Sequence, residues 1–238
     1  MIRACLPSLR LTAVLALAAL LGGCGGVPLI DSARQGPFFE PANHRGEPDL
    51  GGLRRVVLLP LCAGSVAPAE SAAALDPVFA AELQKQNRFE VVALTRDDFR
   101  RQFGLAEMAS TAALPRDFMS VLRREYAADG VIFVDLTAYH AYRPLALGVR
   151  AKLATVEGVR LVWTFDNVFA ADNPEVANSA RHYYVESDRS GVPADLTPAA
   201  LQSPSQFAKY VAAATFDTLP PVVALQPGPR AKTSARNR

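Results

Sequence analysis

The sequence contains one cysteine placed where its thiol can undergo a specific covalent modification. Cys24 follows Leu21, Gly22 and Gly23, so a peptidase that cuts before the cysteine meets only small residues next to the scissile bond. A thiol at this position can carry diacylglycerol as a thioether, which would anchor the chain in a membrane. The predicted cleavage point is therefore the Gly23–Cys24 bond, and the predicted lipidation site is Cys24.

The residues before Cys24 have the properties of an export signal. Arg3 and Arg10 precede an apolar run at 11–21, and no acidic residue occurs before Asp31. This run is shorter than the roughly 20 apolar residues that a membrane-spanning helix needs. A basic start, a short apolar stretch and small residues at the cleavage point are typical of a secretory signal. The combination resembles the lipobox of bacterial lipoproteins; the alternative is an ordinary secretory signal that contains a cysteine by chance.

The predicted location follows from this assignment. Residues 1–23 are the expected signal peptide, and the mature protein is expected on a membrane, lipid-anchored and facing the periplasm. Gly25 occupies the position after the acylated cysteine, where aspartate is the usual inner-membrane retention signal in enterobacteria. We therefore expect an outer-membrane location in a Gram-negative host.

Only one other cysteine remains in the predicted mature chain. Cys5 leaves with the signal, so Cys62 is the single free thiol. One thiol excludes an internal disulfide, although the periplasm would permit one. Cys62 ends an apolar run, and we expect it to be buried like a small hydrophobic residue. A reactive or intermolecular thiol is the alternative.

No pattern in the sequence indicates catalysis or metal binding. A phosphate-binding loop ending in Gly-Lys-Ser/Thr is not found, and neither is a Gly-x-Ser-x-Gly nucleophile turn. The acidic pairs Asp97/Asp98 and Glu186/Asp188 are explained by helix capping and solvation. No histidine has a second ligand at metal-binding spacing; the histidines are His44, His140 and His182. We predict no catalytic residues, no metal and no cofactor.

An aromatic and basic cluster is the main candidate for a binding surface. Tyr139, His140, Tyr142 and Arg143 lie close together at the end of a long predicted strand. Tyrosine and arginine are enriched at the positions that contribute most to protein interfaces. The alternative is that these rings cover the open edge or the core of the sheet.

The charge distribution argues against nucleic-acid binding. The precursor has 25 basic and 23 acidic residues, and loss of Arg3 and Arg10 leaves 23 of each. Four further basic residues occupy the last nine positions, namely Arg230, Lys232, Arg236 and Arg238. Without them the chain has 19 basic and 23 acidic residues, a net charge of −4. A nucleic-acid-binding domain would need positive charge on its folded surface.

One domain is expected between two less ordered ends. Residues 24–52 are rich in glycine and proline, which is typical of a tether, with Phe38 and Phe39 as candidates for docking on the domain. Residues 220–238 predict a disordered basic tail, with weak attraction to anionic lipid or cell-wall polymer as the alternative to simple solvation. Residues 53–219 have the length of one ordinary domain.

The first half of this domain is predicted to be a βαβ unit followed by helices. Residues 56–61 form a continuous apolar run, typical of a strand covered on both faces, and 89–94 predict a second strand. Asp76 and Pro77 suit the N-cap and first turn of the helix between them. A further helix is expected after Thr95, which has an acidic residue three positions later.

The second half predicts an antiparallel meander and a final helix. A long strand spans 131–142, and apolar residues then alternate with polar ones over 145–153 and 159–165. The residues expected on the buried face of the last strand are Val159, Leu161, Trp163 and Phe165. Together the elements predict an α/β (α+β) fold, a single domain with a mixed five-stranded sheet and flanking helices.

Two short motifs resemble a known family. They are Ala128-Asp129-Gly130-Val131-Ile132-Phe133-Val134 and, after it, Leu153, Val156, Gly158 and Trp163. These residues are similar to the CsgG-like, TolB-N-terminal-like domain of bacterial outer-membrane lipoproteins, a group that includes the curli secretion pore subunit and the penicillin-binding-protein activators. The resemblance spans roughly residues 55–219 and implies a scaffold or partner-binding domain without catalytic machinery.

These observations favour a membrane-anchored periplasmic lipoprotein that serves an envelope complex as a non-enzymatic binding or accessory protein. Its partner would be another envelope protein. The alternative is a subunit of an oligomeric CsgG-like secretion pore, which would need long segments with alternating lipid-facing residues. Residues 139–147 are too short for this, and 172–205 lack the alternation. An envelope hydrolase is a more distant alternative, for which no clustered nucleophile is seen.

Overall fold

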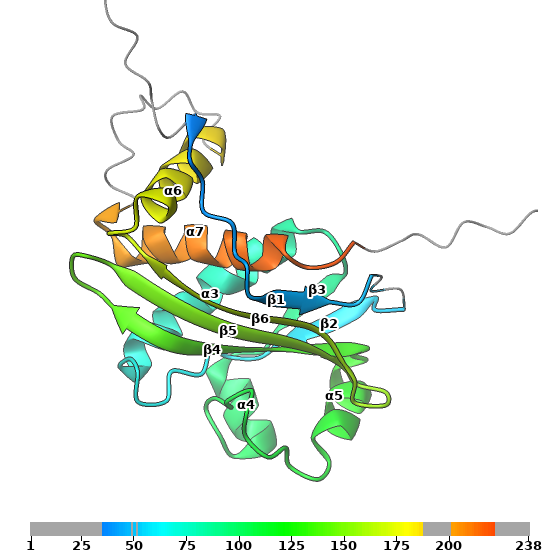
Figure 1. The fold of residues 1–238 in the computed structure, drawn as a ribbon. Coiled ribbons are helices and arrows are strands. Elements are labelled where there is room, and N and C mark those ends of the chain that lie inside the picture. Colours follow the sequence, from blue (N-terminus) through cyan, green and yellow to red (C-terminus); the bar gives the residue numbers. More distant parts are fainter. Residues whose placement is uncertain (1–34, 49, 51, 188–200, 222–238) are drawn as a thin grey trace, which may run out of the picture.

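A single six-stranded mixed sheet forms the centre of the protein (Figure 1). The structure is a computed structural model, and it describes residues 35–48, 50, 52–187 and 201–221. The strands lie in the order β1-β6-β5-β4-β2-β3. Their bounds are β1 His44–Gly46, β2 Arg55–Leu58, β3 Glu90–Ala93, β4 Gly130–His140, β5 Ala146–Thr155 and β6 Leu161–Ala170. The predicted α/β class is confirmed, whereas the predicted number of five strands is one too few.

The additional strand lies within the segment predicted to be a tether. β1 pairs antiparallel with β6, with His44 opposite Phe165 and Gly46 opposite Trp163. All three residues of β1 are exposed, so this strand has no hydrophobic alternation by which the sequence could reveal it. It is a strand only because β6 offers a free edge.

The parallel half of the sheet agrees with the predicted βαβ unit. β2 pairs in parallel with β3 on one side and with β4 on the other. Val56, Val57 and Leu58 are buried, as expected for a strand with layers on both of its faces. β2 is therefore a central strand of the domain.

The antiparallel half is the predicted meander with one irregularity that changes a prediction. Leu153 of β5 lies opposite Trp163, whereas Ala154 lies opposite Leu161, so Val162 is an extra residue in β6. This bulge reverses the alternation at the start of the strand. Trp163 and Phe165 are buried as predicted. The predictions for Val159 and Leu161 are wrong: each residue is 54 % exposed, and Val159 lies in the β5–β6 turn rather than in the strand.

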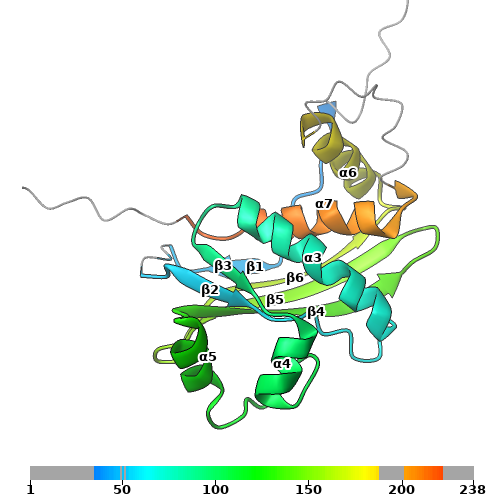
Figure 2. The same ribbon diagram turned by 180° about the vertical axis from the view of Figure 1, so that it is seen from behind.

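Helices cover both faces of the sheet (Figures 1 and 2). α3, α6 and α7 lie on one face, and α4 and α5 lie on the other beneath the parallel strands. The helix bounds are α3 Ala69–Lys85, α4 Arg96–Phe103, α5 Phe118–Tyr126, α6 Pro174–Ser187 and α7 Pro204–Asp217. Each face thus has its own hydrophobic core among the described residues.

The predicted start of α3 is wrong. The helix begins at Ala69, and Pro77 lies inside it. The alanine-rich first two turns have high helix propensity, which accounts for the earlier start. The Asp76 side chain instead accepts a hydrogen bond from the Leu61 N–H at 2.9 Å and so fastens the helix to the end of β2.

The predicted cap of α4 is confirmed. The Thr95 hydroxyl accepts a hydrogen bond from the Asp98 N–H, and Gly104 ends the helix with φ 75°. The rings of Phe99 and Phe103 lie 4.9 Å apart on one face of the helix. This face packs in the hydrophobic core between the sheet and the helices α4 and α5, to which Phe118 of α5 also contributes.

The segment before β1 docks on α6 and β6. Phe39 packs on Phe169 with a centroid distance of 5.3 Å, and its N–H donates to the Ser179 hydroxyl at 2.7 Å. After β1, the chain buries Leu50, which is 2 % exposed. Phe39 docks as predicted, and folded structure extends upstream of residue 53.

Candidate partner-binding site

The β4–β5 connection presents the residues predicted as an interface. Tyr142 is 87 % exposed, and Arg143 and His140 are also exposed. Tyr139, in contrast, packs against the core on the α3, α6 and α7 side. The structure therefore places three of the four predicted residues at the surface and directs the fourth inward.

A second bulge explains the position of Tyr139. Leu136 lies opposite Val149 and Ala138 lies opposite Gly148, so Thr137 is an extra residue in β4. Before this point the even-numbered residues of β4 face the core on the side of α3, α6 and α7. After it the alternation is shifted by one residue. Tyr139 consequently shares the face of the buried Leu147, its partner on β5.

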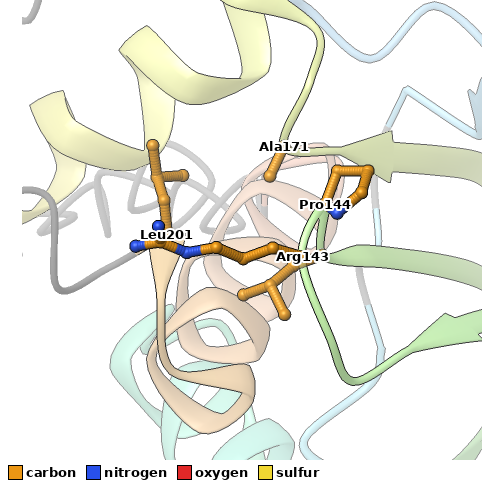
Figure 3. A pocket seen from close by; sticks show the side chains of 5 residues that line it. Arg143, Pro144, Ala171 and Leu201 are labelled. Atoms are coloured by element: carbon orange, nitrogen blue, oxygen red, sulfur yellow. The ribbon is translucent and has the colours of Figure 1, made fainter.

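A cavity of about 440 Å³ lies beside the exposed tip. The described residues that line it are Arg143, Pro144, Leu145, Ala171 and Leu201 (Figure 3). The Arg143 side chain reaches across toward Leu201, while Pro144 and Ala171 lie on the other side. Cavities of about 300–1,000 Å³ with a mostly apolar lining are typical binding sites for small ligands and for anchoring side chains.

Within the described part of the chain, three separate segments contribute to this cavity. Only the first of them, the β4–β5 tip, is identified as a candidate site by its sequence. Leu145 follows the β4–β5 tip, Ala171 links β6 to α6, and Leu201 lies just before α7. The Ala171 N–H donates to the Leu145 carbonyl at 2.8 Å, which fixes two of the walls relative to each other. Neither Ala171 nor Leu201 has a sequence feature that would distinguish it from any other small or apolar loop residue.

Among the described residues that line the cavity, Arg143 is the only charged one. Its guanidinium has no hydrogen bond or ion pair with the described part of the chain. Most arginines in the described residues are ion-paired, namely Arg55, Arg96, Arg100, Arg101, Arg123, Arg124, Arg150 and Arg160. The five N–H donors of Arg143 are thus available to a ligand, and an anionic group would satisfy them best.

A second polar cluster, at the carboxyl end of β2, is occupied by the protein itself. Arg96 forms hydrogen bonds with Asp76 at 2.7 Å, with Glu107 at 2.7 Å and with the Leu61 carbonyl at 2.7 Å. The other Glu107 oxygen accepts from the N–H groups of Ala63 and Gly64 at 3.2 Å. The cluster joins the end of β2 to α3, α4 and the loop after α4, and all of its charges are paired.

The pKa values of the two carboxyl groups in this cluster are shifted in opposite directions. Burial raises the pKa of Asp76 above its ordinary value of 3.8, although the hydrogen bonds from Arg96 act the other way. Burial also opposes ionisation of Glu107, but hydrogen bonds from Arg96 and Gly64 outweigh it and bring the pKa of Glu107 below 4.5. Of the two carboxyl groups that bind Arg96, Glu107 is therefore the one that ionises more readily.

Cys62 is buried, as predicted. Its pKa is raised to about 11, mainly by burial and then by the neighbouring charges of Glu107 and Asp135. A thiol with such a pKa is protonated at neutral pH and is a poor nucleophile. The alternative of a reactive thiol is not supported.

A Ser–Asp pair is the arrangement that comes nearest to a catalytic one. The Ser110 hydroxyl donates to Asp135 at 2.6 Å, and the Ser110 N–H donates to the same carboxylate at 2.8 Å. Lys152 donates to the Ser110 carbonyl at 3.0 Å rather than to the hydroxyl. These bonds fasten the loop after α4 to the sheet, and no histidine in the described residues contacts the pair.

The histidines lie apart. His44 is in β1, His140 ends β4, and His182 packs on Phe38 with a centroid distance of 4.5 Å. Within the described residues, no three His, Cys, Asp or Glu side chains gather as metal ligands. No helix in that part of the chain is long and apolar enough to cross a membrane. Gly23 and Cys24, the predicted cleavage and lipidation residues, lie outside the described residues.

No protein-family model matches the chain, and no curated protein matches it. Among solved structures, it is similar to the PelC dodecamer of Paraburkholderia phytofirmans, with 12 % identity over 75 % of this chain and 96 % of that one and a TM-score of 0.43. Lipoprotein GNA1162 of Neisseria meningitidis has 16 % identity over 50 % of this chain and 85 % of that one, with a TM-score of 0.39. The LpoB C-terminal domain of Salmonella enterica has 17 % identity over the same shares, 50 % and 85 %, and a TM-score of 0.32.

Proposed function

We propose that this chain is a lipid-anchored protein of the bacterial outer membrane, facing the periplasm, whose domain binds another envelope protein as a non-enzymatic accessory subunit. The lipid anchor is Cys24, and cleavage between Gly23 and Cys24 releases the signal peptide. The binding surface is the β4–β5 tip with His140, Tyr142 and Arg143. Tyr139 supports this surface from the core side.

The exposure of Tyr142 is the observation that most favours partner binding. Tyr142 is 87 % exposed, so most of its surface is open to solvent, and the next residue, Arg143, lines the cavity. Burial of such a ring in an interface is favourable and costs little side-chain entropy. Long strands on either side and the core contact of Tyr139 hold the tip in place, so the ring is presented on a rigid support.

The chemistry of the described residues agrees with an accessory role. Each polar cluster described above satisfies its own donors and acceptors and connects structural elements. Arg143 and the cavity beside it form the one arrangement described above that combines an unpaired charge with an accessible apolar surface. Such an arrangement suits recognition of another molecule.

Site-specific photocrosslinking in the producing cells tests this proposal. A photoreactive amino acid at Tyr142 should give one discrete crosslinked species that contains an envelope protein. Val159, which is 54 % exposed in the β5–β6 turn at the other end of the meander, provides the control position. Equal crosslinking from both positions, or none from Tyr142, would contradict partner binding at the tip.

A further inference from the structure

Among the described residues, the open cavity beside Arg143 combines a mostly apolar lining with one cationic group. Pro144, Leu145, Ala171 and Leu201 contribute carbon surface, and Arg143 contributes the charge. A ligand that fits both parts must present an apolar group to the walls and an acceptor to the guanidinium. A wholly apolar ligand would leave the guanidinium without a partner.

The frame of the cavity is formed before any ligand binds. Leu145 is buried, and its carbonyl accepts the hydrogen bond from Ala171. The two helices that follow the walls are linked by the Tyr184 hydroxyl of α6, which donates to the Gln206 carbonyl of α7 at 2.7 Å. A rigid site loses little conformational entropy on binding, so even a small ligand segment can be held.

The surface around the cavity favours a protein ligand over a lipid surface. Tyr142 is the only large hydrophobic residue of the β4–β5 tip that is strongly exposed. Insertion into a bilayer would require several such residues together. A single exposed tyrosine beside an arginine and a small apolar cavity is instead the composition of a protein interface.

We propose that this cavity binds a segment of the partner protein in which an apolar side chain stands next to a carboxylate. The apolar side chain enters between Pro144, Ala171 and Leu201, and the carboxylate accepts two hydrogen bonds from the Arg143 guanidinium. Tyr142 covers the segment from outside. This inference rests on the proposed function, since it specifies what the partner presents to the tip.

Fluorescence anisotropy with defined peptides tests the chemistry directly. The probes are labelled hexapeptides with a central Phe-Glu, a central Phe-Gln or a central Ser-Glu, titrated with the mature acylated protein in detergent micelles. We expect the Phe-Glu peptide to bind about tenfold more tightly than the Phe-Gln peptide, since hydrogen bonds between charged groups have about that effect on affinity. The Ser-Glu peptide should also bind more weakly than the Phe-Glu peptide. Micelles without protein serve as the control and should show no preference among the three peptides.

Matched variants assign the effect to the cavity. In Arg143→Gln the preference for Phe-Glu over Phe-Gln should disappear, whereas Arg116→Gln, which removes an exposed and unpaired arginine before α5, should leave the preference unchanged. Ala171→Leu, which fills the cavity, should weaken the Phe peptides while Arg143 stays in place. Thermal unfolding of each variant shows whether the domain is intact.

Three outcomes would overturn the inference. The first is that the wild-type protein does not distinguish Phe-Glu from Phe-Gln. The second is that the Arg143→Gln variant still distinguishes them. The third is that vesicles with anionic lipid bind the protein through Arg143 while the peptides do not. Crosslinking in cells separates the two proposals. If position 142 crosslinks to an envelope protein equally well with and without the Arg143→Gln substitution, the proposed function stands and only the inference about the cavity fails.

Discussion

The carboxylate of Asp129 accepts a hydrogen bond from the backbone N–H of Arg55 at 3.0 Å, across 74 positions of sequence. The same oxygen accepts from the Arg54 N–H at 2.9 Å, and the Asp129 N–H donates to the Arg55 carbonyl at 2.8 Å. Asp129 thus acts as a clamp that holds the start of β4 against the start of its parallel neighbour β2. This contact gives a structural reason for the aspartate in the Ala-Asp-Gly motif.

Removal of this clamp should destabilise the domain without changing its fold. Asp129→Ala leaves two N–H groups without an acceptor, which should cost about 1–3 kcal/mol of unfolding free energy. Asp129→Asn keeps one oxygen at the same place and should cost less. Urea denaturation followed by circular dichroism measures both; an Ala variant as stable as wild type would contradict the clamp.

Trp163 should be a major contributor to the core, and Leu161 should not. Trp163 is 1 % exposed, and its indole N–H donates to the Thr218 hydroxyl at 3.2 Å. Trp163→Ala should cost about 3–5 kcal/mol. Leu161→Ala, two positions away but exposed, should stay within about 0.5 kcal/mol of wild type. Similar melting temperatures for the two variants would refute the bulge that separates these side chains.

Stability at acidic pH should depend on Glu107. The pKa of Glu107 is lowered in the folded protein, so its ionised form stabilises the fold above about pH 4.5, and this contribution is lost as the pH falls through the lowered pKa. The free-energy difference between wild type and Glu107→Gln should therefore shrink between pH 6 and pH 3.

Asp76 provides the opposite comparison in the same cluster. The pKa of Asp76 is raised, so the folded state favours its protonated form and gains stability from it as the pH falls toward the ordinary value. Wild type should become more stable relative to Asp76→Asn over the same pH range. Chemical denaturation at several pH values measures both differences, and parallel trends would contradict the assignment.

Gly46 tests whether the segment around β1 belongs to the domain. A Cβ atom at Gly46 would lie 2.4 Å from Cγ of Pro220, which is too close for contact. Gly46→Ala should force these two segments apart and cost about 1–3 kcal/mol. Arg45→Ala, at an exposed neighbouring position, should have little effect. An unchanged melting temperature in Gly46→Ala would mean that residues 44–50 do not pack on the domain.

The anchor is tested at its attachment point. Cys24→Ala should remove the thiol that accepts the lipid, so the variant should accumulate as an uncleaved or mislocalised precursor. Metabolic labelling with a radioactive fatty acid measures this directly. Incorporation of label into the Ala variant would show that the lipid is attached elsewhere or not through this route.

The sequence by itself was sufficient for features with a local physical cause. The continuous apolar run in β2 predicts a strand buried on both faces, and Thr95 predicts the start of α4, because each depends on neighbouring residues only. The alternation through β5 likewise predicts its buried face. From these elements follow the α/β class and the succession of β2 to β6 along the chain.

Tertiary structure decided the features that depend on distant partners. β1 exists because β6 has a free edge, and its own three residues have no strand pattern. The bulges at Thr137 and Val162 turn Tyr139 inward and Leu161 outward, and a bulge depends on how two strands align rather than on one strand's sequence. The cavity beside Arg143 was likewise not predictable, because Ala171 and Leu201 reach it only through the packing of α6 and α7 on the sheet.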